Sequence, residues 1–409
     1  MSKRWSCARC GVVGRIDRMV SLHHSRENFG DKRRNDPRIP WIVNSATSEP
    51  RTVAKNLLGR SRSQAADAWG KWFVMRHFTR NTASSAESQP QIHNENNYFP
   101  ISPAVLNPDM ITDFRVYLRQ QDRFVLYTRE RQRFTRALKD KLLRNGIELV
   151  YVPYHQQDRY DQYVFDNLGS ILDNNEIETD VRSQVFLETS SKHVQQIFEN
   201  KLPALTQESV DNLNHIVDSS LSFLSTKQAM DSLGKFISHD YKTFSHCIHV
   251  FVYTMLLAKN FQFTDKQCKQ IGIGALLHDI GKTLIPRNIL DKPGKLTTLE
   301  WEEVQRHSIY GLRMCAQVSL PQRAINCIVF HHEKFDGTGY PSGLCGPNLP
   351  LEVRILTCCD VYDAITSDRP YAKAETPFNA LKIMNQHMVG TFDLQVFKRF
   401  ISVLGPGQK

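Results

Sequence analysis

Residues 274–282 read Gly-Ala-Leu-Leu-His-Asp-Ile-Gly-Lys, so an adjacent histidine and aspartate, His278 and Asp279, follow directly on an apolar run. Adjacent His and Asp side chains at a helix end can direct two ligands at one metal ion, and the carboxylate can bridge to a second. Lys282 lies four residues after His278, hence on the same face if the helix continues for one more turn. One His-Asp pair is weak evidence, because buried polar pairs are common. Its weight depends on the residues spaced around it.

More candidate ligands lie near the ends of the apolar helices predicted on either side: His246, His307, His331, His332 and Asp360. Each alone has a structural explanation. His246, for example, lies in a helix that is apolar all round, where a hydrogen-bonded core histidine is the more common case. Five histidines and two aspartates in this arrangement are difficult to explain by packing.

Imidazoles and carboxylates without patterned cysteines suit iron, manganese, zinc or nickel better than magnesium or calcium. Seven ligands are too many for one ion and suit two ions that share a bridging carboxylate. Two metal ions a few ångströms apart are the usual arrangement for phosphoester hydrolysis. The residues therefore predict a binuclear phosphohydrolase.

Five motifs in a fixed order carry a family resemblance: His-Asp-Ile-Gly-Lys at 278–282, Lys-Pro-Gly-Lys-Leu-Thr at 292–297, His-Ser-x-x-Gly at 307–311, HHEKFDGTGYPSGL at 331–344 and DVYDAITSDRPYAKA at 360–374. Together they resemble the HD-GYP family of cyclic di-GMP phosphodiesterases, within the HD superfamily of metal-dependent phosphohydrolases. The resemblance covers about residues 240–393. It implies an all-α metallohydrolase core for the C-terminal part of the chain.

The resemblance also implies site residues. One metal ion is expected at His246, His278, Asp279 and Asp360, and a second, bridged by Asp279, at His307, His331 and His332. Both ions are expected to be divalent, iron or manganese. Lys282 is expected to neutralise the scissile phosphate and Arg369 to bind a substrate phosphate. Further substrate contacts are expected from Lys373, Gly339, Tyr340 and Pro341, and Asp363 is expected to support a metal ligand.

Two positions depart from the family pattern. Some members carry a glutamate four residues before the first histidine, which recruits a third metal ion, whereas Lys242 stands there in this chain. A protonated lysine cannot bind a metal ion, so two ions are expected. The basic residue that commonly follows the Arg-Pro-Tyr motif is replaced by Ala372, with Lys373 next, which weakens or shifts one phosphate contact.

The function that the resemblance implies is hydrolysis of cyclic di-GMP to linear pGpG and then GMP, in bacterial second-messenger signalling. Two alternatives stay open: hydrolysis of another cyclic dinucleotide, and a non-catalytic adaptor that binds diguanylate cyclase (GGDEF) domains through the Gly-Tyr-Pro loop. An adaptor should show eroded ligands, whereas all seven are present. No nucleic-acid partner is expected.

The 409 residues allow two or three domains. We expect a mainly α protein with four parts: a basic, largely disordered tail (1–97), a small α/β regulatory unit (98–165), a helical connector (166–238) that can form a homodimer, and the HD-GYP phosphohydrolase domain (239–409). In the α/β unit, strands are predicted at 114–118 and 123–127, a helix at 130–145 and a third strand at 147–152, a ββαβ order.

The composition indicates the compartment in which the protein is expected. The net charge is +10, and residues 1–95 hold 17 Lys and Arg against 8 Asp and Glu. No stretch approaches the 18 consecutive apolar residues of a membrane span. An odd number of scattered cysteines, nine, argues against a disulfide scaffold and favours a reducing cytoplasm.

Overall fold

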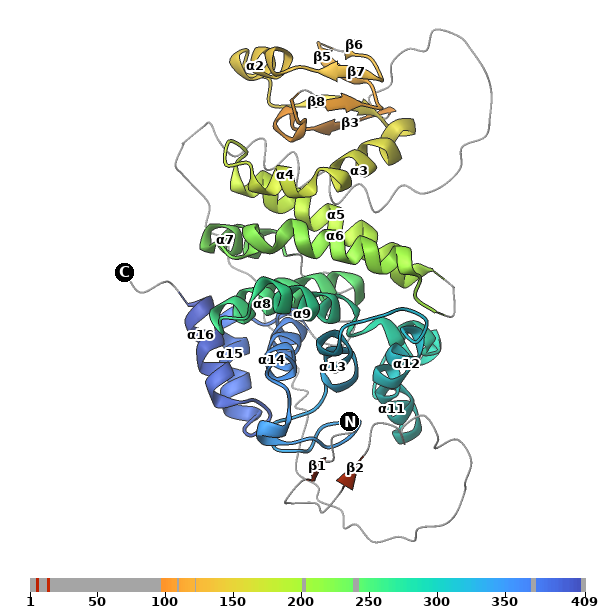
Figure 1. The fold of residues 1–409 in the computed structure, drawn as a ribbon, viewed down its shortest axis with the longest axis vertical. Helices are drawn as coiled ribbons and strands as arrows, with labels where there is room; N and C mark the ends of the chain where they lie inside the picture. Colours follow the sequence, from red (N-terminus) through yellow and green to blue (C-terminus); the bar gives the residue numbers. More distant parts are fainter. Residues whose placement is uncertain are drawn as a thin grey trace, which may run out of the picture. The chain divides into compact units, whose positions relative to one another are not determined.

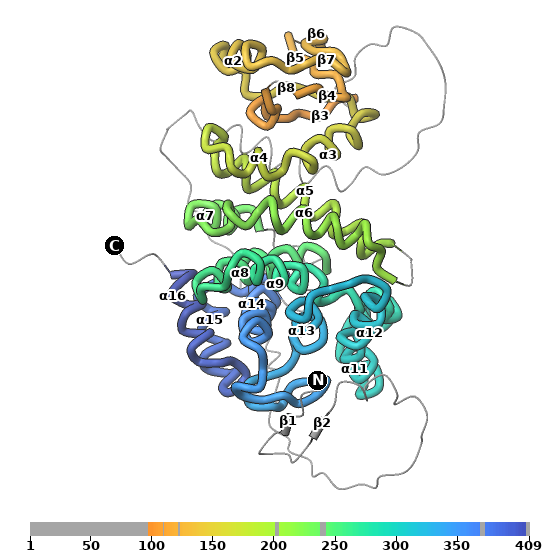
Figure 2. Tube along the Cα trace, in the orientation of Figure 1, coloured from red at the N-terminus to blue at the C-terminus, as the bar shows by residue number. Residues whose placement is uncertain are grey.

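The chain divides into two units, residues 1–90 and 91–409. The computed structural model describes residues 97–405 except 109, 122, 201–203, 238–242 and 369–372, together with two short strands, β1 (Trp5–Ser6) and β2 (Val13–Gly14), which pair antiparallel. The predicted basic tail therefore falls almost wholly outside the described residues, as do Lys242 and Arg369. Figures 1 and 2 show the arrangement of the elements.

The α/β unit has more strands than the sequence predicted. Its elements are β3 (Tyr98–Ile101), the short helix η3 (Pro103–Val105), β4 (Met110–Thr112), β5 (Val116–Gln120), β6 (Arg123–Thr128), β7 (Gln132–Phe134), α2 (Arg136–Arg144) and β8 (Val150–Pro153). One antiparallel sheet has the order β3-β8-β5-β6, and β4 pairs with β7. The predicted helix start at 130 was wrong, because residues 132–134 pair with β4 and Thr135 caps the helix by accepting from the Leu138 N–H.

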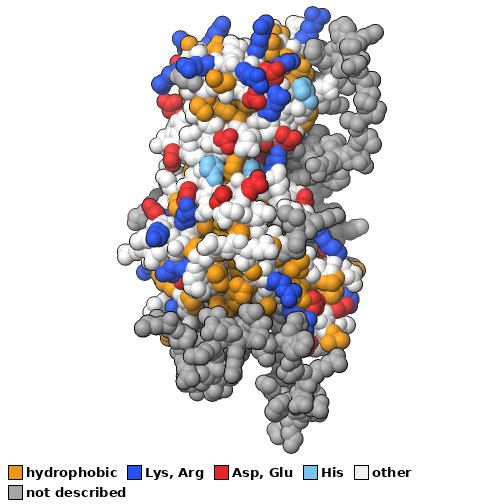
Figure 3. Space-filling view, turned by 45° about the vertical axis from the view of Figure 1, so that its right-hand side comes forward, with side chains coloured by type: hydrophobic (Ala, Val, Ile, Leu, Met, Phe, Trp, Pro, Cys, Tyr) orange, Lys and Arg blue, Asp and Glu red, His pale blue; other side chains and the backbone are white. Residues whose placement is uncertain are grey.

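Lys and Arg side chains gather on the α/β unit in Figure 3. Residues 115–144 hold ten Lys and Arg against three Asp and Glu. The near-neutral charge of the chain beyond residue 95 therefore conceals a second basic region.

A group of helices follows in five segments, with η4 (Tyr154–Gln156) before them: α3 (Gln157–Asp166), α4 (Leu168–Asp173), α5 (Thr179–Glu199), α6 (Gln207–Leu224) and α7 (Lys227–Phe236). Thr206 and Thr226 cap α6 and α7 with their side-chain oxygens. Helices α5 and α6 pack against the next helices of the chain, α8 (Thr243–Asn260) and α9 (Asp265–Leu277). These segments thus share a core with the domain that follows.

The C-terminal part is helical throughout. After α9 come η5 (Ile280–Leu284), α10 (Arg287–Leu290), α11 (Thr298–Gln305), α12 (His307–Met314), α13 (Gln322–Phe330), η6 (Gly346–Asn348), α14 (Leu351–Thr366), α15 (Pro377–His387) and α16 (Leu394–Leu404). Helices α8, α9, α13 and α14 lie side by side (Figure 1). Residues 246–255 of α8 are all buried, which accounts for its apolar character all round. The predicted fold class, a small α/β unit before an all-α domain, is confirmed.

None of the helices in the described ranges combines the length and apolar character of a membrane span.

Candidate metal centre

The predicted ligands converge because they lie where helices end or cross. His278 caps the C-terminus of α9 and Asp279 follows it, His307 begins α12, and His331 caps α13. The remaining members come from the helix interiors of α8 and α14 and from the residue after His331: His246, Asp360 and His332. All seven are buried except His332, which is partly exposed.

Asp279 lies between two sets of imidazoles. Its Oδ2 atom is 3.5 Å from His278 Nε2 and 3.9 Å from His246 Nε2. Its Oδ1 atom is 3.5 Å from His307 Nε2 and 3.8 Å from His331 Nε2. One carboxylate thus presents a different oxygen to each set, which is the geometry that a bridging ligand requires.

The ligand atoms form two compact groups. Within each group all ligand atoms lie within 4.8 Å of one another: Asp279, His307, His331 and His332 in one, and His246, His278 and Asp360 in the other. Cys247 was not predicted from the sequence, but its sulfur atom also lies within 4.8 Å of ligand atoms of His278 and Asp279. Burial raises the pKa of the Cys247 thiol well above its usual value, and a neutral thiol is a poor metal ligand.

The hydrogen bonds of the imidazoles fix which nitrogen is available. The Nδ1 atom of His278 donates to the carbonyl oxygen of Ala275 (2.8 Å) and that of His307 to the carbonyl oxygen of Val304 (2.6 Å). The Nδ1 atom of His331 donates to the carbonyl oxygens of residues 327 and 328 at 3.1 and 3.0 Å. Because a carbonyl oxygen only accepts, each Nδ1 carries the hydrogen and each Nε2 keeps its lone pair.

Several of these lone pairs have no hydrogen to accept. The Nε2 atom of His278 and the Oδ1 atom of Asp279 are buried without a hydrogen-bond partner. The Nε2 atoms of His307 and His331 lie 3.1 Å apart although neither carries a hydrogen. Buried acceptors that face one another are costly unless a cation binds them, so the residues fit a metal centre.

Burial keeps the histidines neutral. It lowers the pKa of His307 to about 4 and that of His332 to about 3, and it lowers the pKa of His331 well below its usual value. Burial alone would raise the pKa of Asp279, but Lys282 and the surrounding histidines outweigh it and hold that pKa well below the usual range. At neutral pH the centre therefore offers imidazole lone pairs and ionised carboxylates.

Asp363, which the sequence predicts to support a metal ligand, contacts two histidines of α8. Its Oδ2 atom accepts from His246 Nδ1 (2.7 Å) and its Oδ1 atom accepts from His249 Nδ1 (3.1 Å). The His246 Nε2 atom then points at Asp360 Oδ1, 3.0 Å away. His249 was missed, although it lies three residues after His246 and therefore on the same face of α8.

The α-helix does not continue far enough to place Lys282 on the same face as His278. Helix α9 ends at Leu277, and the chain continues as the 3₁₀ turn η5, so the partner is the carboxylate three residues earlier. The Lys282 Nζ atom donates to Asp279 Oδ2 at 2.5 Å. Its ammonium group is thereby held at the edge of the ligand cluster.

The Gly-Tyr-Pro loop lies against the centre. The Tyr340 ring is 4.8 Å from the His332 ring, and the Tyr340 N–H donates to the His332 carbonyl oxygen (3.2 Å). Gly339 packs on the backbone of residues 332–334, and Pro341 follows Tyr340. Glu333, which was missed, is buried and accepts from the Ser342 N–H at 2.6 Å, which ties the loop to the residue after His332.

The structure does not test the two basic residues predicted near the substrate phosphates. Arg369 lies outside the described residues, and Lys373 is exposed. Their roles stay predictions.

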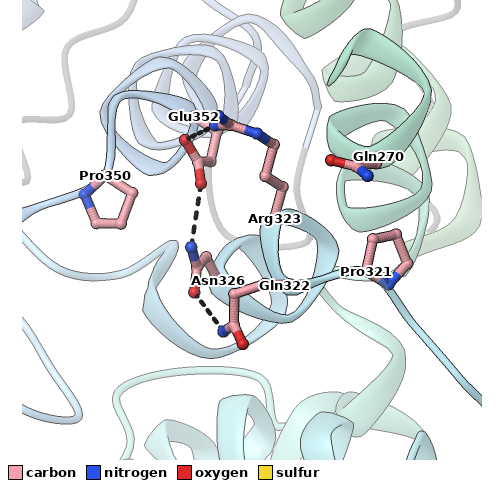
Figure 4. Close-up of a pocket in the computed structure, with 7 residues that line it drawn as sticks. All are labelled: Gln270, Pro321, Gln322, Arg323, Asn326, Pro350 and Glu352. Carbon is pink, nitrogen blue, oxygen red and sulfur yellow. Dashed lines mark hydrogen bonds and ion pairs between the residues drawn. The ribbon is translucent and has the colours of Figure 1, made fainter. Parts of the chain in front are cut away.

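A surface pocket of about 570 Å³ lies elsewhere on the domain, lined by Gln270, Pro321, Gln322, Arg323, Asn326, Pro350 and Glu352 (Figure 4). Glu352 accepts from Arg323 Nη1 (2.6 Å) and from Asn326 Nδ2 (3.0 Å). Because Glu352 pairs with the Arg323 charge, the pocket is not an anion site. The contacts join α13 to α14, which supports the position of His331.

The fold is a helical domain with a buried cluster of histidines and aspartates that could hold metal ions. Residues 216–396 match the family described as HD domain. This region of the chain is therefore similar to that family, and it contains the Gly-Tyr-Pro motif at residues 339–341. The match begins inside α6, ahead of the boundary predicted at 239.

The relatives act on cyclic dinucleotides. The chain is 41% identical over 189 residues to the cyclic di-GMP phosphodiesterase PA4108 of Pseudomonas aeruginosa, covering 46% of this chain and 45% of that protein. It is 39% identical over 155 residues to the 3'3'-cGAMP-specific phosphodiesterase 3 of Vibrio cholerae, covering 38% of this chain and 34% of that protein. The chain thus matches less than half the length of these relatives.

A solved structure supports the fold. Bd1817, an HDG"Y"P protein from Bdellovibrio bacteriovorus, superposes with a TM-score of 0.50 at 21% identity, covering 75% of this chain and 99% of that one.

Proposed function

We propose that this chain is a metal-dependent phosphodiesterase that hydrolyses cyclic di-GMP to pGpG and then to GMP. The observation that carries the proposal is Asp279, whose two oxygens face two separate groups of neutral histidines. The 41% identity to a cyclic di-GMP phosphodiesterase supports the choice of substrate.

The two groups would each hold one divalent ion, with Asp279 shared between them. When bound, such ions lower the pKa of water and stabilise negative charge on a phosphoryl oxygen. The chain's own residues keep the site ready for them: the backbone carbonyls orient the imidazoles, and burial prevents their protonation at neutral pH. Only Asp279 and Asp360 contribute negative charge among the seven ligands, so the loaded site would attract a phosphate diester.

Lys282 would act on the substrate. It lies beside the one carboxylate that faces both groups, so its ammonium group is positioned to stabilise charge that develops on the phosphate during the reaction. Tyr340, next to His332, would border the bound nucleotide.

A second substrate is supported by the 39% identity to a 3'3'-cGAMP-specific phosphodiesterase. Two further predictions concern partners: binding of a GGDEF domain at the Gly-Tyr-Pro loop, and a homodimer through residues 166–238.

The test is parallel turnover of the two cyclic dinucleotides. The full chain is purified anaerobically, its metal content is measured, and cyclic di-GMP and 3'3'-cGAMP are each incubated with it while the products are resolved by chromatography. We expect pGpG and GMP from cyclic di-GMP, and no products from an Asp279→Asn variant. Hydrolysis of 3'3'-cGAMP alone would assign the second substrate, and no hydrolysis of either by metal-loaded protein would refute the proposal.

A further inference from the structure

Helix α11 carries a large aromatic side chain that packing does not explain. None of its residues is buried, and the helix is held by polar contacts: a capping box between Thr297 and Glu300, and an ion pair between Glu300 and Lys292 at 2.6 Å. Trp301 nevertheless exposes 48% of its surface on this helix. Burial in a hydrophobic core therefore does not explain a half-exposed indole on this helix, and a binding role is the alternative.

The indole lies beside the metal centre. Its ring is 6.4 Å from the Tyr340 ring, and the Tyr340 ring is in turn 4.8 Å from His332 and 6.4 Å from His307. Trp301 is therefore separated from two candidate ligands by a single aromatic ring. A ligand whose phosphate lies at the histidines would extend its adjoining group toward this pair of rings.

The two rings form a corner. The planes of Trp301 and Tyr340 meet at 84°, an edge-to-face arrangement. Because about half of Trp301 is exposed, a flat heterocycle can stack on the indole while its edge meets the phenol ring. Bases bind proteins in this manner without hydrogen-bond readout, because every base has a π-face.

We infer that Trp301, with Tyr340, forms a stacking subsite for a purine base of the substrate. The inference rests on the proposed function, because it takes the ligand to be a purine nucleotide whose phosphate binds at the histidine centre. It adds a residue that fixes the position of the base while the phosphate reacts.

The chain offers a matched control. Leu299 lies on the same helix and exposes 76% of its surface, more than Trp301. Residues two apart on a helix do not share a face, so Leu299 points away from the subsite. Loss of its side chain tests whether any exposed apolar group on α11 affects the reaction.

The kinetic experiment uses the metal-loaded full chain with cyclic di-GMP. Trp301→Ala should raise KM by about fivefold to a hundredfold, the range expected for the loss of one stacked base, with kcat changed by less than about threefold. Trp301→Phe should recover most of the loss because it keeps a π-face, and Leu299→Ala should leave KM within about twofold. A Trp301→Ala variant with unchanged KM, or a Trp301→Phe variant as impaired as Trp301→Ala, would overturn the subsite.

A binding experiment separates this inference from the proposed function. Trp301 is the only tryptophan after residue 97, the other four being Trp5, Trp41, Trp69 and Trp72. In protein labelled with 5-fluorotryptophan, the fluorine signal that disappears in Trp301→Phe belongs to Trp301. If the wild type hydrolyses neither cyclic dinucleotide, the proposed function fails, and a shift of that signal on titration with GMP still supports the subsite; no shift up to millimolar GMP overturns it.

Discussion

The metal affinity of this chain should depend on Asp363, a residue that binds no metal in our assignment. Asp363 is fully buried and accepts from His246 Nδ1 at 2.7 Å and from His249 Nδ1 at 3.1 Å. The first contact keeps the hydrogen on Nδ1 and directs the Nε2 lone pair at the ligand cluster. Asp363→Ala removes both acceptors, so the His246 ring loses the constraint on its tautomer and its orientation.

The size of the effect follows from this contact. Loss of a hydrogen-bond partner behind a metal-binding histidine costs about 10- to 100-fold in affinity, or about 1.4 to 2.8 kcal/mol. Asp363→Ala should weaken metal binding by about 100-fold. Asp363→Asn keeps one carbonyl acceptor for two histidines and should weaken metal binding by about 10-fold. The order of affinities is thus wild type, then Asn, then Ala.

The assay is calorimetric titration of metal-free protein with Mn²⁺ at pH 7.5, with folding checked by circular dichroism. Asp393 serves as the control, because it is also buried against α14, where it accepts from Arg354 at 2.6 Å, and it caps α16. Asp393→Ala should cost about 0.5–2 kcal/mol of stability and leave the affinity for Mn²⁺ unchanged. An Asp363→Ala variant that is folded and binds Mn²⁺ within threefold of the wild type would refute the reasoning.

Three further predictions address charge, packing and pH. Lys282→Ala should lower kcat and kcat/KM together by about a hundredfold with the metal ions retained, measured with cyclic di-GMP, while the surface variant Lys269→Ala stays at the wild-type rate. Gly281→Ala should lower the free energy of unfolding, measured by urea denaturation, by at least about 3 kcal/mol, because its Cβ would lie 1.9 Å from the His307 carbonyl oxygen. The control Gly234→Ala, whose Cβ meets nothing within 4 Å, should instead stabilise the chain by about 0.5–1 kcal/mol. In EDTA the free energy of unfolding should fall as the pH falls from about 6.5 to 4. The pKa of His307 is about 4 in the folded protein and 6.5 as its ordinary value, so the unfolded chain binds more protons in this window. This group alone should lower the free energy of unfolding by up to about 1.4 kcal/mol per pH unit. A flat stability profile in EDTA across that window would contradict the assignment of His307 as a buried neutral histidine.

The fold could be predicted for those helices whose own residues show a helix pattern, without reference to a partner element. The apolar character of α8 all round and the Thr297 capping signature are local, and the structure contains both features. Strands β3, β4 and β7 were missed because each has only three or four residues and exists through its partner. Tyr98, for example, pairs with Pro153, 55 residues later. A single sequence gives no signal for such a pairing.

The candidate site divides in the same way. The seven candidate ligands could be selected from the sequence because histidines and aspartates stand out against apolar helices, and the structure brings all seven together. Glu333 and Trp301 were missed because their roles depend on distant partners: Glu333 matters through the Ser342 N–H, and Trp301 through the Tyr340 ring. An exposed indole and a loop glutamate are ordinary residues until the neighbouring element is known.

Helices α8 and α14 contain a spacing that could have revealed the support of the centre. His246 and His249 are three residues apart on α8, and Asp360 and Asp363 are three residues apart on α14, so each pair shares a helix face. When the two helices pack, one aspartate meets the lone-pair side of His246 at 3.0 Å and the other meets its N–H side at 2.7 Å. The same imidazole cannot satisfy both carboxylates with one hydrogen, so the shorter contact retains it and the other side is left for a cation. A His pair and an Asp pair, each at a spacing of three residues on two packed helices, therefore indicate both the candidate metal ligand, His246, and the residue that sets its tautomer, Asp363.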